Sequence, residues 1–204
     1  VTYIRSGATE FAAEARTVLE LGERYPGDAG VLAAMLLNRI SLAPGQGIYL
    51  SAGNLHSYLH GVGMEVMANS DNVLRGGLTP KHVDVPELLR VLDFTPVDDV
   101  RVGTRRDGIE TVYETPAAEF AASVLTLEDP DLGHEVDVPA HHDGPQILVC
   151  TRGSVIVRAP KSGQDAPDEV RLDRGSAAWV AADDGPITLQ ADEASAVFRA
   201  TVGL

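Results

Sequence analysis

Residues 147–159, ILVCTRGSVIVRA, form two short apolar runs separated by an Arg-Gly turn. Further runs rich in β-branched and aromatic residues flank them, each bounded by Gly, Pro or Asp: EFAASVLTL at 119–127, SAAWVAA at 176–182, PITLQA at 186–191 and SAVFRATV at 195–202. Short β-rich runs between turn residues are typical of antiparallel sandwiches and barrels. The sequence after Phe94 therefore predicts a mainly β structure.

This β-rich part is expected to form a complete small antiparallel jelly roll from about residue 115 to residue 204. Its apolar interior is predicted to contain Leu148, Val155, Trp179, Val180, Leu189 and Phe198. Residues 95–116 resemble a connector. The turn-then-strand pattern occurs twice in the chain, which indicates two related β modules.

The first part of the chain predicts mixed structure. Apolar residues recur at helical spacing over Thr9–Tyr25, which predicts an amphipathic helix. The run VLAAMLLNRISL at 31–42 suits a helix or a strand, and the alternation after Leu37 favours a strand, followed by a second strand at GIYL, 47–50. Asp84, three residues before Glu87, predicts a capped short helix.

The composition excludes some classes of partner. With 16 Lys and Arg against 30 Asp and Glu, the net charge is −14, which repels phosphate backbones and anionic lipids. We therefore expect neither a nucleic acid nor a membrane partner. The single Cys150 lies in an apolar run and is expected to be buried. The sequence has neither a signal pattern nor an apolar run of roughly 18 residues, so a cytoplasmic location is expected.

One polar stretch, SAGNLHSYLHGVGMEVMANSDNVLRGGLTPKHVD at 51–84, concentrates groups that suit chemistry. Five residues separate Gly45 from Ser51, and Gly53 then precedes His56 by three positions. This spacing resembles the second cupin motif, with Ser51 in place of its proline and His60 in place of its asparagine. A glycine turn that directs a histidine into a barrel mouth can bind a metal, although a lone histidine is more often hydrogen-bonded or exposed.

The stretch as a whole resembles the type I phosphomannose isomerases, and the likeness runs through most of the chain. The resemblance implies a mainly β fold of cupin-type jelly-roll or antiparallel β-barrel modules with a short helical N-terminal segment. It also implies that the chain is the C-terminal portion of such an enzyme. Residues 1–31 would end a helical insertion, 32–100 would form the C-terminal half of the catalytic cupin, and 101–204 a second, non-catalytic cupin.

The family interconverts mannose 6-phosphate and fructose 6-phosphate with the help of Zn²⁺. The resemblance implies that His56 is a zinc ligand, Arg75 the catalytic arginine, Glu65 a glutamate of the sugar site, Tyr58 a tyrosine lining that site and Lys81 a lysine at its mouth. The family's other zinc ligands, a Gln-x-His pair and a glutamate, are expected upstream of this chain. The expected partners are therefore a sugar phosphate and the missing N-terminal half of the enzyme.

Isomerisation of an aldose to a ketose requires a base, stabilisation of a developing oxyanion and a grip on the phosphate. Glu65 is a candidate base, although the alternation in MEVM also suits a strand whose glutamate is solvated. Arg75 supplies positive charge for the enediolate or for a phosphate oxygen. The identity of the base stays open.

The second β module carries a degenerate form of the same pattern. Gln146 and Gly153 correspond loosely to the glutamate and glycine of the first cupin motif, but no histidine follows Gly175 at the spacing of the second motif. His142, beside His141, is more simply a solvated loop residue. This module is expected to be structural and free of metal.

Two other functions compete with the isomerase hypothesis. The chain could be a non-enzymatic cupin fragment that binds sugars or a protein partner. A cupin oxidase or dioxygenase is disfavoured, because its metal needs two or three histidines with a carboxylate and only His56 is suitably placed.

Overall fold

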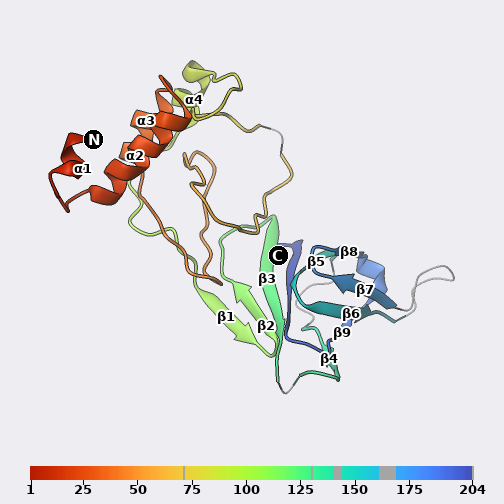
Figure 1. Cartoon of the computed structure of the whole chain (residues 1–204). Coiled ribbons are helices and arrows are strands. Elements are labelled where there is room, and N and C mark those ends of the chain that lie inside the picture. The colour runs from red at the N-terminus through yellow and green to blue at the C-terminus, as the bar shows by residue number, and fades with distance from the viewer. Residues whose placement is uncertain (71, 130, 140–143, 161–168, 204) are drawn as a thin grey trace. The chain divides into compact units, whose positions relative to one another are not determined.

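The computed structural model describes residues 1–70, 72–129, 131–139, 144–160 and 169–203. The chain forms two compact units (Figure 1). The helical unit comprises Val1–Gly61 and Ser70–Val100, and the β unit comprises Val62–Asn69 and Arg101–Leu204. The last change of unit along the chain, at Val100, lies close in sequence to Phe94, after which the sequence predicts mainly β structure.

The β unit is a sandwich of two antiparallel sheets. A six-stranded sheet has the order β1-β2-β3-β10-β5-β8, and a four-stranded sheet has the order β4-β9-β6-β7. The strands are β1 Thr104–Asp107, β2 Glu110–Tyr113, β3 Phe120–Leu127, β4 Glu135–Asp137, β5 Gln146–Arg152, β6 Ser154–Arg158, β7 Glu169–Asp173, β8 Ala177–Val180, β9 Thr188–Gln190 and β10 Ser195–Val202, with a short 3₁₀ turn, η2 Ala182–Asp184. This architecture confirms the predicted mainly β, cupin-type fold.

The interior of the sandwich follows from the alternation of side chains along each strand. On β5, the side chains of Leu148 and Cys150 are fully buried. Ile147, which precedes Leu148 and points to the other face, is 44% exposed. The predicted interior residues Leu148, Val155, Val180 and Leu189 are buried, as the sequence indicates. They pack with Leu125, Leu127, Cys150, Val157, Leu172 and Val197 in one apolar core.

Two predicted interior residues lie on the outside instead. Trp179 is 64% exposed and sits opposite Ile147, on the outer face of the six-stranded sheet. Phe198 is only partly buried, because its neighbours Val197 and Arg199 occupy the inward positions of β10. The prediction is wrong for both residues because a difference of one position along a strand moves a side chain to the other face.

The prediction of a connector over 95–116 is also wrong. Strands β1 and β2 form a hairpin with Asp107 opposite Glu110, and Gly108 in its turn has φ +56°. Strand β2 then pairs with β3 and extends the six-stranded sheet. The sequence TRRD lacks the apolar alternation of a strand, but a glycine at the first position of the two-residue turn, Gly108 before Ile109, is a hairpin signal.

The helical unit consists of short elements: α1 Thr2–Arg5, α2 Ala12–Arg24, α3 Gly30–Ala33, the 3₁₀ turn η1 Ala34–Leu36, and α4 Val85–Val91. Helix α2 confirms the amphipathic helix predicted over Thr9–Tyr25. The Asp84 carboxylate accepts a hydrogen bond from the Glu87 N–H at 3.1 Å, which confirms the predicted cap of α4. None of the described helices has the length and apolar character needed to cross a bilayer.

The two strands predicted near residues 31–50 are not formed. Residues 30–36 are helical, and the chain from Leu37 is extended without a ladder apart from one bridge residue, Ile48. A short apolar run suits either kind of element, and here the local helical bonds prevail. The extended segment is held to residues 97–100 instead, through Asn38 Nδ2 to the Val97 carbonyl at 2.7 Å and the Tyr49 N–H to the Val100 carbonyl at 2.9 Å.

Candidate functional site

The loop that carries His56 is built on Gly53. This glycine has φ +87°, and a Cβ added there would lie 3.0 Å from the Val91 carbonyl oxygen, so both conformation and space require glycine. The Gly53 carbonyl accepts a hydrogen bond from the Asp93 N–H at 3.1 Å, which joins the loop to the end of α4. The predicted glycine turn is present, although His56 follows it in extended chain and not in a strand.

The imidazole of His56 is oriented by its own loop. Its Nδ1 lies 3.0 Å from the Asn54 carbonyl oxygen, and its ring meets the ring of Tyr58 edge-on with centroids 5.9 Å apart. A carbonyl can only accept, so Nδ1 carries a proton, and in the neutral imidazole Nε2 then carries the lone pair. A histidine whose Nδ1–H is held by a carbonyl has the arrangement typical of a metal ligand that binds through Nε2.

Arg75 precedes a tight packing point within the helical unit. Its side chain is exposed. A Cβ on Gly77 would lie 2.8 Å from the Gly30 Cα, so the glycines of the two segments touch. The Asp28 carboxylate links the same segments, accepting from the Gly30 N–H at 2.7 Å and the Leu78 N–H at 2.8 Å. Gly77 thus serves close backbone packing, and Asp28, which the sequence analysis missed, fixes the loop behind Arg75.

Lys81 follows on a short turn after Pro80. Its backbone N–H donates to the Thr79 hydroxyl at 3.2 Å, and its side chain is exposed. Helix α4 begins four residues later, so the segment between Arg75 and α4 is anchored at both ends, by Asp28 and by the Asp84 cap.

Glu65 belongs to the other unit. It lies on the segment Val62–Asn69, which groups with the β unit, and its side chain is exposed. The structure thus brings His56 and Tyr58 into contact and places Arg75 and Lys81 in the same unit as them. The resemblance to the isomerases implies that His56, Tyr58, Glu65 and Arg75 belong to one site, and this stays a prediction.

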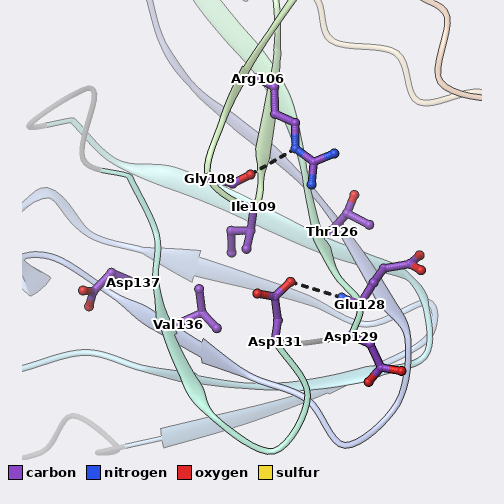
Figure 2. A pocket seen from close by; sticks show the side chains of 9 residues that line it. All are labelled: Arg106, Gly108, Ile109, Thr126, Glu128, Asp129, Asp131, Val136 and Asp137. Carbon is purple, nitrogen blue, oxygen red and sulfur yellow. Dashed lines mark hydrogen bonds between the residues drawn. The ribbon is translucent and has the colours of Figure 1, made fainter.

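The β unit has a cleft of about 430 Å³ that the sequence did not indicate (Figure 2). It lies beside the β1–β2 hairpin. Arg106 Nε donates to the Gly108 carbonyl at 3.2 Å, and the Glu128 carboxylate pairs with Arg152 at 2.5 Å. The lining is mixed, and its charged residues are mostly acidic: Arg106, Gly108, Ile109, Thr126, Glu128, Asp129, Asp131, Val136 and Asp137.

A buried ion pair lies inside the sandwich. Arg199 Nη1 donates to both carboxylate oxygens of Glu110, at 3.1 and 3.2 Å, and to the Pro139 carbonyl at 2.9 Å. The Ser123 hydroxyl also donates to Glu110. Sequence reasoning missed this cluster, although the charged residue within SAVFRATV was its one visible signal.

The other candidates for a reactive or metal-binding side chain are Cys150 and the histidines outside the His56 loop. Cys150 is fully buried and burial raises the pKa of its thiol, which supports its reading as a core residue. No group of three or more His, Cys, Asp or Glu residues suited to a metal occurs within the described parts of the chain. His141 and His142 lie outside the described residues.

Comparisons with known proteins point to one group of enzymes. No family model matches the chain. The mannose-6-phosphate isomerase of Salmonella typhimurium is 36% identical over 178 residues, covering 84% of this chain and 41% of that protein. The human mannose-6-phosphate isomerase is 35% identical over 190 residues, covering 90% of this chain and 43% of that protein.

The comparison with solved structures points to the same enzymes. The crystal structure of the apo Salmonella typhimurium enzyme matches with a TM-score of 0.77 at 33% identity, over 93% of this chain and 46% of that one. The crystal structure of the same enzyme bound to fructose 6-phosphate and zinc also matches with a TM-score of 0.77, over 93% of this chain and 45% of that one. By sequence and by structure, this chain is similar to the mannose-6-phosphate isomerases, and it spans about two fifths of the length of those relatives.

Proposed function

We propose that this chain supplies part of the active site of a mannose-6-phosphate isomerase that interconverts mannose 6-phosphate and fructose 6-phosphate in the cytoplasm. In this proposal residues 1–31 end a helical insertion, 32–100 form the C-terminal half of the catalytic cupin, and 101–204 form a non-catalytic cupin. The similarity to the Salmonella typhimurium enzyme, which has been solved with fructose 6-phosphate and zinc, supports the proposal.

The observation that carries the proposal is the geometry of His56. The hydrogen bond from Nδ1 to the Asn54 carbonyl leaves Nε2 as the donor atom for Zn²⁺. When bound, zinc supplies Lewis acidity that polarises the sugar oxygens. Catalytic zinc needs about three protein ligands, and His56 provides one, so the remaining donors come from polypeptide outside this chain.

Glu65 and Arg75 act on the sugar in this scheme. Isomerisation moves a proton between adjacent carbons through an enediol, and Glu65 is the candidate base. Arg75 stabilises the negative charge that develops on oxygen. Solved variants of the Salmonella typhimurium enzyme include a glutamate-to-alanine and an arginine-to-alanine mutant at positions 10 residues apart, the same separation as Glu65 and Arg75.

Lys81 and Tyr58 serve binding. The chain carries a net charge of −14, so a dianionic phosphate needs a local positive charge, which the exposed Lys81 supplies. Tyr58 meets the His56 ring edge-on. In this proposal the phenol lines the sugar site beside that histidine.

A second candidate function is a non-enzymatic cupin that binds a sugar or a protein partner. The observation that favours it is that the described residues provide His56 as the single suitably placed zinc donor, because one histidine with water holds zinc weakly. The two functions differ in whether the other zinc ligands are supplied by further polypeptide.

The test compares the 204-residue chain alone with the same chain supplied with the N-terminal portion of an isomerase, fused or in trans. The chain alone is expected to be inactive, and the completed protein to form fructose 6-phosphate from mannose 6-phosphate. In the completed protein His56→Ala should abolish zinc retention, whereas His82→Ala, a matched exposed histidine of the same unit, should retain it. Equal activity of the chain alone and the completed protein would refute the proposed division of the site.

Arg75→Ala is the complementary variant of the completed protein. It should keep zinc and lose turnover by about 10²- to 10³-fold, as expected for removal of one electrostatic donor to a developing oxyanion. Full activity of this variant would remove Arg75 from the mechanism, and metal analysis of the same samples separates this outcome from zinc loss.

A further inference from the structure

Arg75 lies just before a segment whose backbone has an unusual conformation. Leu78, three residues after Arg75, has φ +54°, in the left-handed region that residues with a Cβ rarely adopt, and Gly77 before it has φ +120°. A non-glycine residue keeps such a conformation only where the surrounding structure holds it. The contacts that hold Leu78 therefore also restrict where the backbone of Arg75 lies.

One of these contacts comes from Asp28, 50 positions earlier in the chain. Asp28 Oδ2 accepts a hydrogen bond from the Leu78 N–H at 2.8 Å, and Oδ1 accepts one from the Gly30 N–H at 2.7 Å. The two oxygens thus join the start of α3 to the segment after Arg75. A Cβ on Gly77 would lie 2.8 Å from the Gly30 Cα, so the two backbones are already in contact and the segment cannot move closer.

The same segment also touches the loop that carries His56. Gly76 directly follows Arg75, and a Cβ added to Gly76 would overlap the side chain of Leu55, the residue before His56. Contacts with Asp28 and with Leu55 therefore hold residues 76–78 within the helical unit. The exposed side chain of Arg75 extends from a backbone whose position relative to the His56 loop is fixed.

We propose that Asp28 is a positioning residue for Arg75 in the isomerase reaction, a role that rests on the proposed function. A cation stabilises a developing oxyanion best when it is directed at that oxygen before the reaction begins. A misplacement of about 1 Å can cost about 10²-fold in rate. Asp28 acts through the Leu78 amide and the backbone, and it holds Arg75 in place before the sugar phosphate binds.

The first test is Asp28→Asn in the completed protein. The single amide oxygen of asparagine can keep the local bond from the Gly30 N–H, whereas its NH₂ group cannot accept from Leu78. We expect kcat to fall by about 10- to 100-fold, KM to change by less than about 2-fold, and zinc to be retained. Asp98→Asn removes the same charge from an exposed position of the same unit and is the control, with kcat unchanged.

The double variant Asp28→Asn, Arg75→Ala separates positioning of Arg75 from a general structural role. Because Asp28 acts through Arg75, the double variant should be no slower than Arg75→Ala alone. A double variant slowed by the product of the two single effects overturns the role of Asp28. Full turnover of Asp28→Asn beside a slow Arg75→Ala overturns that role alone and leaves the proposed function intact. Full activity of Arg75→Ala, or no isomerisation by the unmodified completed protein, refutes the proposed function and the role of Asp28 with it.

Hydrogen exchange in the 204-residue chain gives a readout that does not depend on activity. Asp28→Asn should speed exchange of the Leu78 amide by about 10-fold, as expected for one lost hydrogen bond, and leave the Gly30 amide protected. Gly77→Ala leaves Asp28 unchanged but places a Cβ against the Gly30 backbone, so it should displace Leu78 and speed its exchange in the same way. Unchanged exchange at Leu78 in either variant overturns the role of Asp28.

Discussion

The two units of this chain are stabilised in different ways. The β unit closes a continuous apolar core, in which Leu125, Leu148 and Leu189 are completely buried. In the described part of the helical unit only Leu21 and Val31 are buried large apolar residues, while Leu36 is 87% exposed and Phe94 is 71% exposed. Burial of apolar area is the main favourable term in folding. The β unit therefore has a core of its own, and the described part of the helical unit depends more on hydrogen bonds.

The largest expected effect on stability comes from breaking the buried Arg199–Glu110 ion pair of the β unit. Arg199→Met leaves Glu110 buried without its partner, which should lower the free energy of unfolding by about 3–5 kcal/mol. Chemical denaturation followed by the fluorescence of Trp179, the single tryptophan, measures the loss. The double variant Arg199→Met, Glu110→Met should recover most of the stability, and a double variant as unstable as the single one would contradict this account.

The next effect compares equivalent truncations in the two units. Leu148→Ala removes a fully buried side chain from the β core and should cost about 2–5 kcal/mol of unfolding free energy. Leu36→Ala removes an exposed side chain of the helical unit and should change stability by no more than about 0.5 kcal/mol. Similar losses from both variants would show that the helical unit has a core after all.

A smaller effect concerns the hydrogen bonds of the helical unit. Asp28→Ala removes the acceptor for the Gly30 and Leu78 amides and should cost about 1–2 kcal/mol. The loop behind Arg75 should then be cut faster by trypsin at Arg75 and Lys81. Glu23→Ala, at an exposed position of α2, is the control and should leave the cleavage rate unchanged.

The smallest effect is a pH dependence in the β core. Burial raises the pKa of the Cys150 thiol, so the folded state favours the neutral form. The stability from this group is present below the ordinary thiol pKa, about 8.5, and is lost as the pH rises through the raised value. Cys150→Ala should flatten the alkaline side of the stability profile, and an identical profile in both proteins would assign that loss to other groups.

Sequence patterns could predict the strands whose composition is apolar, such as β5, β6 and β10. They could not predict β1, because TRRD is charged and becomes a strand only through the Gly108–Ile109 turn and pairing with β2. The face occupied by Trp179 depends on register, which a run of four residues does not determine. The prediction of a strand within residues 31–42 was wrong for a related reason, because the apolar residues of this run suit a helix as well as a strand.

In the candidate site, too, the local features could be predicted from the sequence and the long-range contacts could not. The turn at Gly53 depends on residues within a few positions, and the sequence indicated it. The contact of His56 with the Asn54 carbonyl is also local, but the sequence analysis did not predict it. The Asp28 link and the Arg199–Glu110 pair join residues 50 and 89 positions apart, so no local pattern could indicate them. Contacts at such separations are determined by the tertiary fold.

The Asp28–Leu78 hydrogen bond also has a consequence for the order in which the chain folds. It closes a loop of 50 residues, and closing a flexible loop of this length has an entropic cost of about 3.5 kcal/mol. Helices α2 and α4 need only local contacts and can form within microseconds. The segment that carries Arg75 should therefore become ordered late, after both helices exist, and it should be the first part of the helical unit to open when the chain is destabilised.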